Sequence, residues 1–177
     1  MKPRVLMIDG PDIAQRVPLA QRLTGYDVVL AGSAHHDRAI GGFEYHRYPL
    51  GRGINPLSIV GTYFRLRKII ATVTPDVVQT FSTSSGIWGR IAAAHEAVPV
   101  IVGTINGLGT LYSRGSRTTP VRAVYERLQR YACRVSTTVV FQNGRDLDEM
   151  VTLRMVDAGR CVLIPGSGVD VERFHSA

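Results

Sequence analysis

The chain has 177 residues, of which 45% are hydrophobic and 20% charged, a composition that excludes a disordered tail, a collagen-like repeat and a coiled coil. Lysine and arginine number 21 against 14 acidic residues, a formal net charge of +7, which favours an anionic partner such as nucleic acid, a phosphorylated ligand or a membrane surface. The two cysteines, Cys133 and Cys161, lie far apart and predict neither a disulfide framework nor a zinc site. No stretch approaches the roughly 18 apolar residues of a membrane-spanning helix, so we expect a soluble or peripheral protein of a reducing cytoplasm.

Short runs rich in β-branched residues alternate along the chain with segments of helical periodicity. The predicted strands are Arg4–Asp9, Asp27–Ala31, Phe43–Leu50, Val77–Phe81, Pro99–Ile105, Thr137–Gln142 and Cys161–Ile164. The predicted helices are Ile13–Leu23, a long helix capped by Asn55-Pro56, Gly86–Ala97, Thr119–Val135 and Asp146–Leu153. This alternation predicts a doubly wound α/β domain, with a mostly parallel sheet of about seven strands and helices on both faces.

The loops at the carboxyl ends of the strands are the candidate site, because ligands of such sheets bind there. The first loop, Asp9–Asp12, contains a single glycine and lacks the G-x-G-x-x-G pattern of NAD and FAD sites. Gly10 is a weak candidate for holding a phosphate or a sugar hydroxyl, and equally an ordinary turn residue. Ser84 and Ser85 begin a predicted helix, where their hydroxyls either cap it or bind a polar substrate.

Six phrases occur in order along the chain: RGINPL (52–57), PDVVQTF (75–81), GIWGR (86–90), TINGLG (104–109), VFQN (140–143) and IPGSGVD (164–170). Together they resemble the N-terminal half of bacterial family-4 glycosyltransferases, especially those that build lipid-linked polysaccharide, O-antigen and capsule units. The resemblance covers nearly the whole chain. It implies one half of a GT-B fold, in which two Rossmann-like domains face each other across a cleft.

The resemblance also implies how the activity is divided. Residues 1–170 would form the acceptor-binding domain and residues 171–177 the start of the interdomain linker. The C-terminal donor-binding domain would be absent from this chain, because the family's two glutamates separated by seven residues have no room here. We expect a retaining glycosyltransferase that uses a UDP- or GDP-sugar and a lipid-linked or glycan acceptor. This chain alone is expected to bind no cofactor and to transfer no sugar.

Several members of that family carry a histidine at the end of the fifth strand, and the matching position here is Asn106. Asparagine cannot act as a general base, so it would orient the acceptor or the donor sugar. Asp9 and Asp12 are the nearest carboxylates for the acceptor hydroxyl, although capping of the first helix is an equal alternative. The catalytic candidates are Asn106 and Asp12, and the predicted acceptor site comprises Asp9, Gly10, Ser84, Ser85, Asn106 and Gly107.

Arginine is concentrated around the helix Thr119–Val135. The six residues predicted to contact a membrane or a phosphate are Arg114, Arg117, Arg122, Arg127, Arg130 and Arg134. At 100° per residue, the predicted apolar stripe is Val121, Val124, Tyr125, Leu128, Ala132 and Val135. Each basic residue near an anionic leaflet contributes about 1 kcal/mol, so the six predict attachment to the inner face of the cell membrane; a solvated helix face is the plainer alternative.

The long helix after Asn55 carries a second apolar surface. Ile59, Tyr63, Leu66, Ile70 and Val73 have the spacing of a core stripe, whereas Leu57, Val60 and Phe64 point elsewhere, beside Arg67 and Lys68. That cluster predicts either a helix in a membrane interface or packing against a neighbouring helix or a partner subunit.

Other functions fit the sequence less well. Nucleic-acid binding uses aromatic residues interleaved with the charges, but Tyr125 and Tyr131 fall on or beside the core stripe, so no nucleic-acid partner is expected. The adjacent His35 and His36 lack companion ligands at metal-binding spacing. The alternative to a transferase is a free-standing module that binds an anionic glycan or lipid without catalysis, and an oxidoreductase is disfavoured by the missing glycine pattern.

Overall fold

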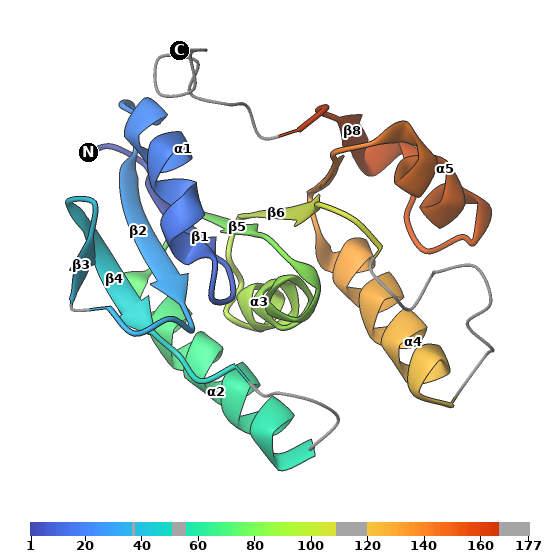
Figure 1. Ribbon diagram of the computed structural model, residues 1–177, viewed down its shortest axis with the longest axis horizontal. Helices are drawn as coiled ribbons and strands as arrows, with labels where there is room; N and C mark the ends of the chain where they lie inside the picture. Colours follow the sequence, from blue (N-terminus) through green and yellow to red (C-terminus); the bar gives the residue numbers. More distant parts are fainter. Residues whose placement is uncertain (37, 51–55, 109–119, 167–177) are drawn as a thin grey trace, which may run out of the picture.

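A computed structural model describes residues 1–36, 38–50, 56–108 and 120–166, with the backbone alone for residues 56–58 and 120–121. Within these residues the sheet has eight strands in the order β3-β4-β2-β1-β5-β6-β7-β8 (Figure 1). The strands are β1 (Arg4–Ile8), β2 (Asp27–Gly32), β3 (Ala39–Ile40), β4 (Phe43–Arg47), β5 (Val77–Thr80), β6 (Val100–Ile105), β7 (Thr138–Phe141) and β8 (Cys161–Leu163). All neighbouring pairs are parallel except β3 and β4, which confirms the predicted fold class.

The strand β3 was not expected, so the prediction of about seven strands is one too few. It pairs with β4 as a hairpin, with Ile40 opposite Phe43. The two residues between them, Gly41 and Gly42, have φ angles of 58° and 87°. A two-residue hairpin loop with both φ angles positive suits glycine, and this Gly-Gly pair is the signal that sequence reasoning overlooked.

The helices agree with the sequence except at their boundaries. They are α1 (Val17–Arg22), α2 (Pro56–Val73), α3 (Thr83–His95), α4 (Pro120–Val135) and α5 (Gly144–Thr152), with short 3-10 helices η1 (Ile13–Arg16) and η3 (Ala158–Arg160). The predicted helix Ile13–Leu23 is divided between η1 and α1 because Pro18 has no N–H to continue the ladder. Helix α5 begins two residues early because the Asn143 side chain accepts a hydrogen bond from Asp146 N. Among the described residues, no helix is long and apolar enough to cross a membrane.

The helices divide unequally between the two faces of the sheet. On one face, η1 and α1 pack against β1 and β2 through Ile13 and Ala20. On the other face, α2 and α3 pack through Leu66, Ile70 and Ala92. Helices α4 and α5 lie on this second face too, since their core cluster includes Ile105, which points to the same side of its strand as the residues facing α3.

The buried faces of the long helices were predicted only in part. In α2, Leu66, Ile70 and Val73 are buried, and Phe64 is 58% exposed, as expected. In α4, Ala132 is buried, but Val124 is 59% exposed and does not belong to the core stripe. The buried side of α4 instead includes Gln129 and Cys133, for a reason that lies in the site.

Candidate functional site

Three loops meet at the carboxyl edge of the sheet. The register places Ile8 beside Thr80 and Thr80 beside Gly103, so β1, β5 and β6 end at the same rim. From β1 the sheet continues through β2, β4 and β3, and from β5 it continues in the opposite direction through β6, β7 and β8. The boundary between β1 and β5 is therefore the switch point where doubly wound sheets bind ligands. The loops after Ile8, Thr80 and Ile105 therefore form one rim, as the sequence predicted.

Asp9 is fully buried at the centre of this rim. Its Oδ2 accepts a hydrogen bond from Arg16 Nε at 2.8 Å, while Oδ1 accepts from Gly10 N at 2.7 Å and from the hydroxyl of Ser82. The Arg16 guanidinium lies 4.4 Å from the centre of the Phe81 ring. Asp9 thus ties the β1 loop, η1 and the β5 loop together, and its contact with an acceptor stays a prediction.

Ser82 joins these loops through a strained backbone. It precedes α3 with φ 61° and ψ 171°, a region that residues other than glycine rarely adopt. Its hydroxyl donates to Asp9 and makes no cap on α3. Ser84 and Ser85 do not cap this helix either, because α3 already begins at Thr83 and both serines lie inside its first turn.

Gly10 and Ser85 lie against each other beneath the rim. A Cβ atom on Gly10 would lie 3.3 Å from Ser85 Oγ. Because glycine has no Cβ atom, the loop after β1 can approach Ser85 closely at this position. The buried Tyr48 hydroxyl donates to Asp9 O at 2.6 Å, and burial raises the pKa of Tyr48. Ser85 Oγ makes no hydrogen bond of normal geometry with a described residue. It nevertheless lies close to the Tyr48 hydroxyl, and this contact lowers the pKa of Tyr48 and so opposes part of the effect of burial.

A small cavity of about 150 Å³ opens beside this cluster. It is lined by Ser82, Thr83, Arg90, Ile105, Asn106, Gly107, Leu108, Tyr125 and Gln129. The cavity therefore lies between the β6 loop, the first turn of α3 and helix α4. Of the predicted site residues it includes Asn106 and Gly107, and Ser82 connects it to Asp9.

The floor of the cavity holds a cation that sequence reasoning missed. Arg90 is 2% exposed, and it donates to Gly86 O at 2.9 Å, to Gln129 Oε1 at 3.3 Å and to Cys133 Sγ at 3.5 Å. Arginine has five N–H donors, so two are left over. Among the described residues no carboxylate pairs with Arg90, and a buried charge without a counter-ion favours an anion beside it.

Two features of the sequence point to Arg90 in hindsight. Gly103 lies within β6, and a Cβ atom there would lie 2.7 Å from Arg90 Nη1, so the glycine leaves room for the guanidinium. Gln129 is the polar residue on the buried side of α4 because it accepts from that guanidinium. Tyr125 also borders the group: burial raises its pKa, and a hydrogen bond with Thr83 and the Arg90 charge oppose the rise.

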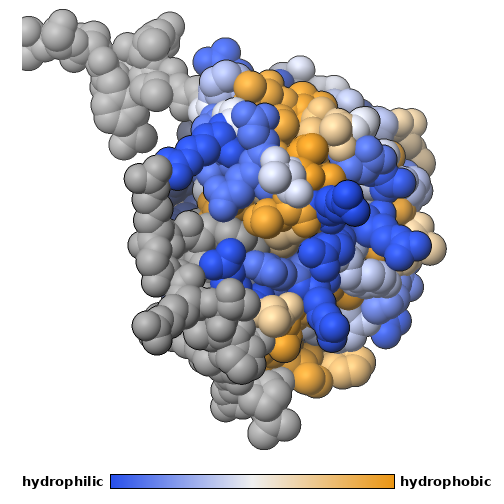
Figure 2. Space-filling view, turned by 90° about the vertical axis from the view of Figure 1, so that its right-hand side faces the viewer, coloured by the Kyte–Doolittle hydropathy of each residue, from blue (hydrophilic) through white to orange (hydrophobic). Residues whose placement is uncertain are grey.

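The remaining predicted residues lie elsewhere. Asp12 is exposed, and its Oδ1 accepts from Gln15 Nε2 at 3.3 Å without capping η1. Arg122 pairs with Glu126 at 2.8 Å, whereas Arg127, Arg130 and Arg134 are exposed. Arg114 and Arg117 lie outside the described residues. Figure 2 shows hydrophilic side chains between apolar ones over the face formed by α4 and α5.

Comparisons with known proteins bear on the family and on the fold. The family of glycosyl transferase 4-like domains matches residues 14–166. The chain belongs to that family. It spans about a third of the curated relatives it matches. Over 128 residues it is 30% identical to the Escherichia coli enzyme named UDP-Gal:alpha-D-GlcNAc-diphosphoundecaprenol alpha-1,3-galactosyltransferase, covering 72% of this chain and 32% of that enzyme.

A second relative and a solved structure complete the comparison of this glycosyl transferase 4-like domain. It is 25% identical over 133 residues to the N,N'-diacetylbacillosaminyl-diphospho-undecaprenol alpha-1,3-N-acetylgalactosaminyltransferase of Campylobacter jejuni, covering 75% of this chain and 34% of that enzyme. The structure of sucrose-phosphate synthase from Thermosynechococcus elongatus superposes with a TM-score of 0.72 at 14% identity, covering 100% of this chain and 51% of the other. At that identity the structural likeness shows the fold alone.

Proposed function

We propose that the chain is the acceptor-binding domain of a retaining glycosyltransferase that moves a sugar from a nucleotide-sugar to a lipid-linked acceptor in bacterial cell-surface polysaccharide synthesis. The observation that supports this most directly is the cavity at the switch point, where Asn106 and the unpaired cation Arg90 lie together. Both curated relatives carry diphosphoundecaprenol-linked sugars in their names. Such an acceptor presents sugar hydroxyls and an anionic diphosphate, and the cavity offers a group for each.

The cavity is suited to part of a ligand. Its volume of about 150 Å³ is below the roughly 300 Å³ at which pockets for whole small molecules begin. The Asn106 amide can donate to one sugar hydroxyl and accept from another. Arg90, at the floor, supplies a fixed positive charge for a phosphate oxygen.

The two carboxylates of the first loop differ in what they can contribute to a proton transfer. Asp9 is fully buried, and its carboxylate already accepts from Arg16, Gly10 N and the Ser82 hydroxyl. Asp12 is exposed on the same loop and binds only the neutral Gln15 side chain among the described groups. We therefore assign Asp12, and not Asp9, as the carboxylate that assists the acceptor hydroxyl, with Asn106 as an orienting group.

The proposal includes parts outside the described residues. The donor is a UDP- or GDP-sugar held by a separate C-terminal domain, joined through residues 171–177. The site of action is the cytoplasmic face of the membrane, where the exposed Arg127, Arg130 and Arg134 of α4 face anionic lipid. The E. coli relative, whose name includes UDP-Gal, favours the uridine nucleotide.

Activity of the intact protein tests this function. The assay follows transfer from radiolabelled UDP- and GDP-sugars to a short-chain prenyl-diphosphate-N-acetylglucosamine. Asn106→Ala should lower kcat/KM by about 10- to 100-fold, the equivalent of one or two hydrogen bonds to the substrate. Asp12→Asn should lower kcat, while the matched surface variant Gln21→Ala should behave as wild type. Absence of transfer with every donor, or full activity of Asn106→Ala, would contradict the proposal.

A further inference from the structure

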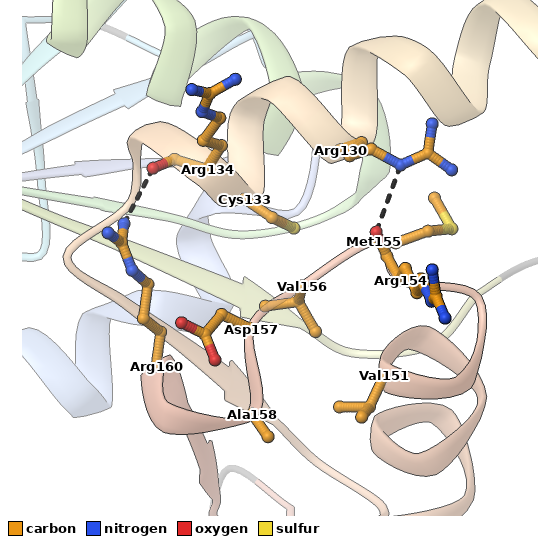
Figure 3. Close-up of a pocket in the computed structure, with 10 residues that line it drawn as sticks. All are labelled: Arg130, Cys133, Arg134, Val151, Arg154, Met155, Val156, Asp157, Ala158 and Arg160. Carbon is orange, nitrogen blue, oxygen red and sulfur yellow. Dashed lines mark hydrogen bonds between the residues drawn. The ribbon is translucent and has the colours of Figure 1, made fainter.

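A second pocket lies at the opposite edge of the sheet, where α4 and α5 end (Figure 3). Its volume is about 500 Å³, and it is lined by Arg130, Cys133, Arg134, Val151, Arg154, Met155, Val156, Asp157, Ala158 and Arg160. These segments precede β7 and β8, so the pocket opens at the amino ends of the strands. It is separate from the rim that carries Asn106, and the proposed transfer does not use it.

The pocket is strongly cationic. Four arginines line it against one aspartate, a net charge of +3. None of the four forms an ion pair with a carboxylate of the described residues. Asp157, the acidic residue of the lining, accepts a hydrogen bond from Gly159 N at 3.1 Å through Oδ1, and it balances only one of the four positive charges. Like charges gathered without counter-ions repel one another, and an anion placed among them removes that repulsion.

Helix capping explains only two of the four arginines. Arg160 Nη1 donates to Arg134 O at 2.8 Å and to Ser136 O at 2.9 Å, and Arg130 Nε donates to Arg154 O at 3.2 Å. Basic side chains often satisfy the last carbonyls of a helix in this way. The two bonds from Arg160 also neutralise the negative end of α4, which would otherwise repel an anion, whereas the bond from Arg130 fixes the turn after α5.

The other two arginines have no such role. The guanidinium groups of Arg134 and Arg154 form no hydrogen bond or ion pair with the residues that the structure describes. Figure 3 shows Arg130 and Arg154 on one side of the pocket and Arg134 and Arg160 on the other, with Cys133 between them. Hydrogen bonds to backbone carbonyls therefore fix Arg130 on one side of the pocket and Arg160 on the other. Arg154 and Arg134, the second arginine on each side, can turn toward a ligand.

The floor between the two pairs is apolar. Cys133, Met155 and Val156 are buried there. An apolar floor screens charges less than open water does, so an anion in this pocket is held more strongly than one on a flat basic surface. The fork of a guanidinium matches two oxygens of a phosphate at once.

We propose that this pocket is a binding site for a phosphate-class anion, held by Arg134 and Arg154 together with the positioned Arg130 and Arg160. The chemistry is shared by a soluble diphosphate and by the phosphodiester headgroup of an anionic lipid. Arg154 and Arg160 were not singled out from the sequence. The site shares Arg130 and Arg134 with the face of α4 that is proposed to meet the membrane. It takes no part in the proposed transfer of sugar, so its test is separate from the transferase assay.

Arg154 offers a test that separates binding from folding. It has φ 52° in the turn that closes α5, where Arg154 N donates to Val151 O and Met155 N donates to Met150 O, both at 2.9 Å. Glycine is the residue that this turn prefers. Arg154→Gly should therefore keep or raise the melting temperature while it weakens anion binding, a combination that a purely structural role for the arginine would not produce.

The measurements are calorimetric titration with sodium pyrophosphate and co-sedimentation with vesicles of phosphatidylcholine, with and without phosphatidylglycerol. Saturable one-to-one pyrophosphate binding that Arg154→Gly and Arg134→Gln each weaken at least about fivefold supports the site and a soluble ligand. Binding to anionic vesicles alone, with the same dependence on both arginines, supports the site and a lipid headgroup.

The control is Arg22→Gln, which removes one charge from the exposed end of α1 and should leave both kinds of binding within about twofold of wild type. Equal weakening by Arg22→Gln would show diffuse attraction and overturn the proposal. Absence of binding to pyrophosphate and to both vesicles would overturn it as well.

Discussion

At the scale of single residues, the rim is organised by Asp9 and Ser82, which are 73 positions apart in the chain. Ser82 holds a backbone conformation that is unfavourable for any residue with a side chain. The hydrogen bond to the buried Asp9 carboxylate opposes that strain. The two effects can be separated by replacing Ser82 in two ways.

Ser82→Ala removes the hydroxyl and keeps the strain, so we expect a loss of about 1.5–3 kcal/mol in the free energy of unfolding, the range for a hydrogen bond to a charged group. Ser82→Gly loses the same hydrogen bond but relaxes the backbone strain. This relaxation should offset about 1–3 kcal/mol of the loss in the free energy of unfolding. Urea unfolding measures both. A glycine variant less stable than the alanine variant would show that the backbone of Ser82 is not strained.

Asp9 shows that a candidate site residue can also organise the loops around it. A carboxylate directly after the first strand is equally suited to bind a ligand or to organise a loop. Its burial and its ion pair with Arg16 show the second role in the structure, and the first stays a prediction. The sequence could not reveal this, because Arg16 reaches Asp9 only where the helix divides into η1 and α1 at Pro18.

At the scale of elements, Tyr48 joins β4 to the β1 loop. Its backbone N donates to Gly32 O at 3.0 Å, and its hydroxyl donates to Asp9 O at 2.6 Å. Desolvation by burial is the main reason that the pKa of Tyr48 is raised above the ordinary value for tyrosine. A tyrosinate at this position would lose its hydrogen bond to the carbonyl.

This link predicts a sensitivity to alkali. Because folding raises the pKa of Tyr48, its contribution to stability is fully present below the pKa of an unfolded tyrosine, about 10, and is lost as the pH rises further. The free energy of unfolding should fall by up to about 1.4 kcal/mol per pH unit for this group. At pH 7 the free energy of unfolding of Tyr48→Phe should be about 1 kcal/mol lower than that of the wild type. Above about pH 10 it should fall less steeply than that of the wild type.

Denaturant unfolding between pH 7 and pH 12 checks this prediction. Tyr45 and Tyr125 also have raised pKa values, so the Tyr48→Phe variant should retain part of the alkaline slope. The matched control is Tyr26→Phe, since Tyr26 is exposed. A slope unchanged by Tyr48→Phe would show that the buried hydroxyl is not coupled to folding.

The helices show where periodicity succeeds and where it fails. In α2 the buried positions follow the expected stripe, because the helix packs on an apolar sheet. In α4 the stripe is displaced from Val124 toward Gln129 and Cys133. Arg90 of the neighbouring helix needs polar partners there, and a pattern read from one helix cannot include the requirements of another.

At the scale of the whole molecule, α2, α3 and α4 lie on one face of the sheet, and their outer surface carries the exposed Phe64 and Arg127. An exposed aromatic side chain with cations on the same layer is typical of a surface that rests on a membrane. Phe64 is 58% exposed, so packing against another helix of the described part of the chain does not account for it.

We therefore expect the chain to bind anionic vesicles through this layer. Arg127→Glu should weaken binding to phosphatidylglycerol vesicles by about 2 kcal/mol, since it removes one positive charge and adds a negative one, and the effect should shrink at high salt. Phe64→Ser should weaken binding with little dependence on salt. Co-sedimentation checks both, and circular dichroism confirms that the fold is kept. Equal binding to neutral vesicles would contradict the electrostatic part.

The sequence by itself determined the alternation of strands and helices, apart from β3 and the division of the first helix, and it determined the mostly parallel sheet. It also predicted the edge of the sheet at which the candidate site is proposed. Each of these follows from periodicity and from the handedness of crossovers, which are properties of neighbouring residues. Only the tertiary structure decided that Asp9 supports the rim, that Arg90 shares a cavity with Asn106 and pairs with no carboxylate of the described residues, and that Arg154 and Arg160 join the arginines of α4. Those facts depend on contacts between distant parts of the chain, such as Arg90 with Cys133, 43 positions away, and packing alone selects such partners.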